Sequence, residues 1–188
     1  MRPQLICVML SLVVAASLSL RAQTPATTGV ANRIVVAKAA RTLTLFSLNR
    51  VLKTYKVALG TNPVGPKERE GDGRTPEGAH VIDWRTRASS YHWALHISYP
   101  NADDRRRAKR LGVSPGGAIL IHGLPNGSGA IGKAHLRHDW TLGCIAVTDE
   151  EIEEIWRLVP NGDRAHSVMA HLEARPANLW FAPDRSWW

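Results

Sequence analysis

The strongest constraint on the fold is a succession of short strand patterns separated by loops rich in glycine and proline. The β-branched run Ile34–Val36 is followed by Thr42–Phe46, where polar and apolar residues alternate with a period of two. Asn49-Arg50 is a typical turn sequence, and residues 51–59 form the return strand. The sequence therefore predicts an antiparallel hairpin and a mainly β fold.

Further strand patterns follow a long loop. Residues 60–78 are rich in glycine and proline and predict irregular structure. Shorter patterns predict strands at 79–83, 91–99 and 118–121, and a last strand at 165–170. The strand at 118–121 is wholly apolar, as in a buried strand, and it leads directly into His122 and Gly123.

Two short helices complete the predicted fold. Residues 102–111 form the first. The second follows a capping box, in which Thr148 precedes Glu151 by three positions. Apolar residues then recur with helical spacing and predict one buried stripe, and Pro160 ends the helix; the stripe consists of Ile152, Ile155, Trp156 and Val159. The segment 135–140 is expected to be a polar connector.

The first 22 residues have the layout of a secretory signal peptide. A positive start precedes an apolar stretch at 5–20, and small residues follow it. That stretch has 16 residues, short of the roughly 20 that a membrane span needs. We therefore expect residues 1–22 to be removed, residues 23–32 to be a linker, and the protein to be exported to a periplasm or cell-wall space.

The net charge favours anionic partners. The formal charge is +8, and Arg2 and Arg21 lie in the predicted signal peptide, which leaves +6 on the remaining chain. Export makes nucleic acid the least expected partner. The densest basic run lies in the first predicted helix and is interpreted as a solvated face; it comprises Arg105, Arg106, Arg107, Lys109 and Arg110.

One cysteine remains once the signal peptide is removed. Cys7 lies inside that segment, so Cys144 is the lone thiol of an exported chain, where cysteines usually pair. A lone thiol in such a compartment is a buried apolar residue, an intermolecular bridge or a reactive group. Gly143 precedes it and leaves backbone N–H groups open to an oxyanion. The residues alone leave these readings open.

His122 is the candidate base for Cys144. It ends a buried strand at a loop, where functional side chains concentrate, and Gly123 follows it. The carbonyl of Gly123 is placed to accept one imidazole N–H and to fix the tautomer. A histidine that merely ends a strand is the alternative interpretation.

These motifs resemble the L,D-transpeptidase catalytic domain (YkuD type). The resemblance rests on His122-Gly123, on the stretch from Thr141 to Ile145 that contains Gly143-Cys144, and on Thr75-Pro76-Glu77-Gly78 upstream. It covers about residues 33–170, which we take as the catalytic domain, followed by a tryptophan-rich tail at 171–188. The fold that it implies is a β-sandwich with two short α-helices.

The resemblance also implies a reaction. Cys144 would attack the carbonyl of the L-centred third residue of a peptidoglycan stem tetrapeptide, expel D-alanine and form a thioester. His122 would accept the thiol proton and protonate the leaving amine, with Gly123 orienting it. An amine acceptor, on a peptide or a wall-linked protein, would complete transpeptidation, whereas water would give a carboxypeptidase or endopeptidase. No metal or cofactor is implied, and carbapenems are the expected inhibitors.

The sequence departs from the family pattern near the nucleophile. Leu142 stands where many members have His, and Ala146 where many have Arg or Asn. The 21 residues between His122 and Cys144 are more than usual. Substrate contacts are therefore expected from Thr141 and, within the longer segment, from Arg137 and His138.

Three other readings are open. His122, His135 and His138, with Asp139, are candidate zinc ligands. A papain-like order would pair Cys144 with His166 or His171. A non-enzymatic wall- or membrane-binding module would use the positive charge and the tryptophans of the tail; these are Trp180, Trp187 and Trp188.

Overall fold

The computed structural model describes residues 29–160 and 169–173. The predicted signal peptide, most of the linker, His166 and the tail beyond residue 173 lie outside the described residues. The described chain forms an eight-stranded sheet in the order β3-β2-β1-β8-β4-β5-β6-β7. Three helical segments flank it, and the mainly β prediction is confirmed.

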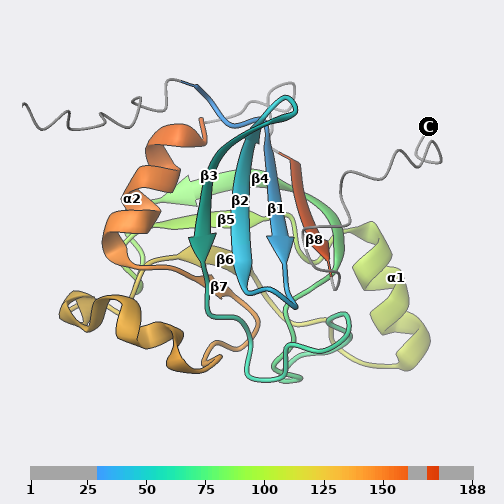
Figure 1. Cartoon of the computed structure of the whole chain (residues 1–188). Helices are drawn as coiled ribbons and strands as arrows, with labels where there is room; N and C mark the ends of the chain where they lie inside the picture. The colour runs from blue at the N-terminus through green and yellow to red at the C-terminus, as the bar shows by residue number, and fades with distance from the viewer. Residues whose placement is uncertain (1–28, 161–168, 174–188) are drawn as a thin grey trace, which may run out of the picture.

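The predicted hairpin forms the front of the molecule (Figure 1). Strands β1 (Arg33–Ala37), β2 (Thr42–Ser47) and β3 (Arg50–Lys56) pair antiparallel in sequence order. Strand β8 (Met169–Glu173) joins β1 in parallel and lies four residues beyond the start of the strand predicted at 165–170. Side chains alternate between the two faces of β1 and β2, and Ile34, Leu43 and Leu45 consequently lie in the core at 0 % exposure.

Strand β4 (Gly78–Thr86) connects the two layers. Its first half pairs with β8, and its second half pairs with β5 (Ala94–Ile97). The register shifts between Ile82 and Trp84, and such a bulge lets one strand turn from one layer to the other. Strands β5, β6 and β7 consequently cross behind the hairpin layer, and the side chains between the two layers form the core (Figure 1).

The strand predicted at 91–99 is shorter than expected, because residues 91–93 form the bend that enters β5. Strand β6 (Ile119–His122) pairs antiparallel with β5. Strand β7 (Ile145–Ala146) pairs parallel with β6. Parallel neighbours require a long crossover, and the 21 residues between His122 and Cys144 provide it.

The predicted polar connector is partly helical. The 3-10 segment η1 (Gly129–Arg137) occupies the crossover and is interrupted at Gly132, whose φ is 48°. The sequence does not predict this segment as helical, because its glycine residues are unfavourable inside a helix. The structure therefore has a third helical segment that the sequence interpretation did not include.

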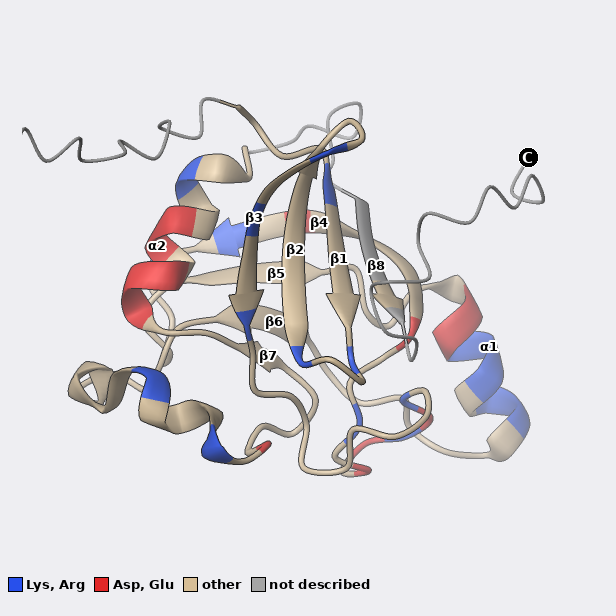
Figure 2. Ribbon diagram, in the orientation of Figure 1, with Lys and Arg blue, Asp and Glu red and all other residues tan. Residues whose placement is uncertain are grey.

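The two predicted α-helices differ in their predominant charge: α1 is mainly basic and α2 is mainly acidic (Figure 2). Helix α1 (Ala102–Leu111) exposes four of its five basic residues and half-buries Arg107, in agreement with a solvated face. Helix α2 (Asp149–Leu158) begins with the predicted capping box of Thr148 and Glu151, and it buries Ile152 and Ile155. In the described parts of the chain, no helix combines the length and the apolar character that crossing a membrane requires.

Candidate active site

The parallel pairing of β6 and β7 places Cys144, which directly precedes β7, next to the strand that ends at His122. The register aligns Ile121 with Ile145, and both are fully buried in the core. Side chains alternate along a strand, so His122 and Cys144 belong to the opposite face of this pair as diagonal neighbours. The backbone N–H of Leu120 donates to Cys144 Sγ at 3.4 Å, which fixes the sulfur next to β6.

The imidazole of His122 is held as one tautomer. Its Nδ1 lies 2.6 Å from the carbonyl oxygen of Gly123. A carbonyl only accepts, so Nδ1 carries the proton and Nε2 is left as the basic nitrogen. The Gly123 contact therefore leaves His122 with the lone pair that a general base needs.

Burial keeps both reacting groups neutral at rest. His122 is 2 % exposed, and burial lowers its pKa to about 4, against the Gly123 hydrogen bond, which raises it. Burial also raises the pKa of Cys144, although the Leu120 N–H and the charge of Lys67 oppose this. The resting pair is thus a thiol beside a neutral imidazole, and proton transfer must accompany attack.

Two aromatic side chains lie beside the imidazole ring of His122. The ring centroid of Tyr91 lies 4.5 Å from that of His122, and the ring centroid of Trp140 lies 5.9 Å away. The sequence motifs assign neither Tyr91 nor Trp140 to the site. Their position follows from the bend before β5 and from the crossover, and neither motif spacing nor periodicity reveals it.

Thr141 organises the turn before the nucleophile. Its hydroxyl accepts from Gly143 N–H at 3.1 Å and donates to Cys144 carbonyl oxygen at 2.7 Å. The φ of Gly143 is 130°, and a Cβ there would lie 2.5 Å from the carbonyl oxygen of Arg74. Glycine is therefore required for this turn to form against its neighbour.

The other side of this turn is held by the segment that follows β3. Ala58 exchanges backbone hydrogen bonds with Ala146, and Thr141 donates to Leu59 and accepts from Thr61. The loop carrying Thr75-Pro76-Glu77-Gly78 joins the same structure, because Thr75 Oγ1 accepts from Gly60 N–H at 3.2 Å. The three motifs that were far apart in the sequence thus meet at one place.

Arg137 and His138 lie at the end of η1, and both are exposed. The structure gives them no contact with the predicted pair, so their part in substrate binding stays a prediction. Asp139, which follows them, has a structural function. Its carboxylate accepts from Leu59 N–H at 2.9 Å and pairs with Arg41 at 2.8 Å.

The alternative assignments find less support. Among the described residues, no group of three or more His, Cys, Asp or Glu side chains is placed to hold a metal ion, and Asp139 is already paired. Strand β8, which carries His171, is separated from β7 by β4, β5 and β6 in the sheet. The tryptophans of the tail lie outside the described residues.

Comparison with known proteins shows the family of the chain. A sequence profile of the L,D-transpeptidase catalytic domain (YkuD) matches residues 31–168. The chain therefore belongs to the YkuD family of L,D-transpeptidase catalytic domains.

Individual relatives are longer than this chain. The putative L,D-transpeptidase YafK of Escherichia coli strain K12 is 30% identical over 132 residues, which cover 67% of this chain and 46% of that protein. The chain thus spans about half the length of the curated relatives that it matches.

Solved structures share the fold. The helical cell shape determining protein Pgp2 from Campylobacter jejuni superposes with a TM-score of 0.60 at 25% identity, over 79% of this chain and 49% of that chain. Bd1075 of Bdellovibrio bacteriovorus superposes with a TM-score of 0.53 at 21% identity, over 80% and 50% of the respective chains.

Proposed function

We propose that the protein is a cysteine-dependent acyltransferase of the peptidoglycan stem peptide. The observation that carries the proposal is the shared face of β6 and β7, on which Cys144 lies diagonal to an imidazole whose Nδ1 is bonded to Gly123. The family to which the chain belongs supplies the substrate class.

The reaction follows from the groups present. His122 Nε2 accepts the proton of Cys144 as the sulfur attacks the carbonyl of the L-centred third residue. The carbonyl oxygen becomes an oxyanion, and the Gly143–Cys144 turn offers it backbone N–H groups. The N–H of Gly143 is shared with Thr141 Oγ1 in the resting state. Collapse of this intermediate breaks the bond to D-alanine, which takes the proton from His122 and leaves a thioester.

The second half of the reaction regenerates the thiol. An amine or a water molecule attacks the thioester, and His122 accepts its proton. The sulfur then leaves as a thiolate and takes this proton from His122. An amine gives a cross-link or a tethered protein, and water gives a carboxypeptidase or an endopeptidase that releases wall-linked groups. Export to the periplasm or cell-wall space belongs to the same proposal, because the substrate is found there.

The substrate assay uses the purified chain and isolated muropeptide tetrapeptides, with products identified by mass. We expect release of D-alanine by the wild type and none by Cys144→Ala, and the product mass identifies the acceptor as an amine or water. Release by both proteins would refute the nucleophile. No release by either would refute the tetrapeptide as donor.

Carbapenems are proposed inhibitors because their strained carbonyl is open to the same attack. We expect one carbapenem molecule to add to the intact mass of the wild type and none to that of Cys144→Ala. An unmodified wild type after prolonged incubation would contradict this expectation.

A further inference from the structure

The peptide that joins Gly123 to Leu124 binds a side chain at each of its two polar groups. Its carbonyl oxygen accepts from His122 Nδ1 at 2.6 Å, and its N–H donates to Asp149 Oδ1 at 2.8 Å. The N–H and C=O of a planar trans peptide point in opposite directions, so the imidazole and the carboxylate bind this peptide from its two sides. A rotation of the peptide would break both hydrogen bonds.

This peptide lies just beyond the part of the chain that the sheet holds. The groups before it have backbone partners: the carbonyl oxygen of His122 accepts from Val147 N–H at 3.0 Å, and Gly123 N–H donates to the carbonyl oxygen of Trp93 at 3.2 Å. Strand β6 ends at His122, so side chains, and not a strand ladder, fix the next peptide. Leu124 is 1 % exposed, and its N–H therefore depends on the carboxylate rather than on water.

Two glycine residues make room for the carboxylate of Asp149. A Cβ on Gly123 would lie 2.6 Å from Asp149 Oδ1, and a Cβ on Gly129 would lie 2.6 Å from Oδ2. Asp149 is the first residue of α2 and directly follows Thr148, whose capping box with Glu151 fixes the start of the helix. The carboxylate is consequently confined between the start of η1 and the residue that follows β6.

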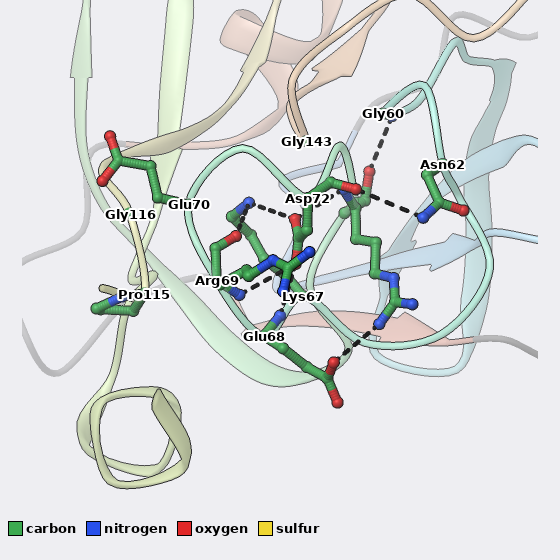
Figure 3. Close-up of polar contacts among 12 residues, drawn as sticks. Gly60, Asn62, Lys67, Glu68, Arg69, Glu70, Asp72, Pro115, Gly116 and Gly143 are labelled. Atoms are coloured by element: carbon green, nitrogen blue, oxygen red, sulfur yellow. Dashed lines mark hydrogen bonds and ion pairs between the residues drawn. The ribbon is translucent and has the colours of Figure 1, made fainter. Parts of the chain in front are cut away.

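Asp72 is a useful contrast, because it is another carboxylate that binds backbone N–H groups near the nucleophile turn. It accepts from the N–H groups of Glu68, Arg69 and Arg74 in its own loop (Figure 3). Those hydrogen bonds shape the loop. The carboxylate of Asp149 differs, because the peptide that it binds is the one whose carbonyl oxygen accepts from the imidazole.

We propose that Asp149 is a positioning residue for His122. By binding Leu124 N–H, it keeps the Gly123 carbonyl turned toward the imidazole, so that the proton stays on Nδ1 and the lone pair stays on Nε2. A carboxylate acceptor also polarises the peptide and strengthens its carbonyl as an acceptor. The inference rests on the proposed role of His122 as the base.

The test determines which ring nitrogen of His122 carries the proton. The full chain is labelled with nitrogen-15 histidine and studied by long-range proton–nitrogen NMR at pH 7, where His122 is neutral because burial lowers its pKa to about 4. His122→Gln identifies the signals. We expect the proton on Nδ1 in the wild type and partly on Nε2 in Asp149→Ala. The kcat for D-alanine release should fall about ten- to a hundredfold in Asp149→Ala, as expected for the loss of a hydrogen bond to a charged group, with KM little changed.

Two further variants separate the acceptor from the charge that Asp149 brings to the N-terminus of α2. Asp149→Asn keeps an oxygen that can accept from Leu124 N–H and should retain the Nδ1–H tautomer and most of the activity. Glu150→Ala removes an exposed charge from the same helical turn and should behave as the wild type. An unchanged tautomer in Asp149→Ala, or an equal change in Asp149→Asn, would overturn the proposal.

Gly129→Ala tests the same contact even if Asp149→Ala fails to fold. The new Cβ would displace the flexible carboxylate of Asp149, so we expect His122 to lose part of its Nδ1–H tautomer. Gly117→Ala is the matched control, because a Cβ there meets nothing within 4 Å. A wild-type NMR spectrum of Gly129→Ala would contradict the proposal.

The NMR spectra require no stem peptide. A tautomer that does not respond to Asp149 therefore refutes the positioning role alone, whereas the release of D-alanine by the wild type decides the proposed acyl transfer separately.

Discussion

At the scale of single residues, the pair of Cys144 and His122 is neutral rather than charged at rest. His122 has one nitrogen committed to Gly123 and a pKa lowered to about 4 by burial. Cys144 has a pKa raised by burial. Both groups therefore keep the protonation state that attack requires over a wide range of pH.

This state predicts a broad pH profile of kcat/KM for release of D-alanine. The free enzyme loses its base only when His122 is protonated, so the acid limb should fall near pH 4 to 5. A histidine of ordinary pKa, about 6.5, would give a limb two units higher. An acid limb near pH 6.5 that disappears in His122→Gln would contradict the buried neutral imidazole.

Gly143 is the residue of the turn that tolerates substitution least. Gly143→Ala places a Cβ against the Arg74 carbonyl oxygen at a φ of 130°, and such strain costs of order 1–3 kcal/mol. We expect a lower free energy of unfolding in urea and a loss of D-alanine release. Gly117→Ala is the matched control, because a Cβ there meets nothing within 4 Å. Equal stability of the two variants would refute this role.

At the scale of secondary-structure elements, the crossover between β6 and β7 positions the site. The end of the crossover, residues 138–141, is called the return arm here. Asp139 fixes this arm because it pairs with Arg41 and accepts from Leu59 N–H. Arg41 directly precedes β2 and Leu59 follows β3, so the two ends of the hairpin hold the arm that carries Trp140 and Thr141. The nucleophile turn thus depends on contacts with residues some eighty to a hundred positions earlier in the chain.

Removing the contacts of Asp139 should loosen the return arm without unfolding the sheet. Asp139→Ala leaves the Leu59 N–H unpaired, and an unsatisfied buried donor costs about 1–3 kcal/mol. We expect lower stability in urea and slower D-alanine release. Asp103→Ala on α1, whose side chain is 70% exposed, should change neither. Undiminished activity of Asp139→Ala would show that the arm is held by other contacts.

The secondary-structure elements that short sequence patterns determine could be predicted from the sequence. The hairpin at β2 and β3 and the α2 capping box follow from period and spacing, and both are present. The third helical segment was missed because glycine residues interrupt η1. Sequence patterns also do not reveal long-range contacts. Tyr91 lies beside His122, and Asp139 binds Leu59 N–H, only because the chain folds these segments together.

At the scale of the whole molecule, the site lies where the two layers meet the crossover. Strand β4 joins the layers through its bulge, and the segment after β3 reaches β7 from the hairpin layer. Of the reacting groups, His122 is buried at the end of β6, and Cys144 is partly buried in the turn before β7. Stability and site chemistry are consequently linked through His122.

The linkage predicts how stability depends on pH. His122 has a folded-state pKa of about 4 and an unfolded value near 6.5, so between these values the unfolded chain binds the extra proton. The contribution is fully present above pH 6.5 and is lost as pH falls toward 4, at roughly 1.4 kcal/mol per unit. Urea unfolding at pH 7 and pH 5 should show this loss in the wild type, and a smaller one in His122→Gln. Equal losses in both proteins would refute it.

The most direct test of Cys144 as the nucleophile is the intact mass of the protein after brief mixing with a stem tetrapeptide and acid quench. We expect an adduct with the mass of the tetrapeptide less D-alanine, located on the peptide that contains Cys144 and absent from Cys144→Ala. An adduct on any other residue, or D-alanine release by Cys144→Ala at the wild-type rate, would contradict the claim that Cys144 is the nucleophile.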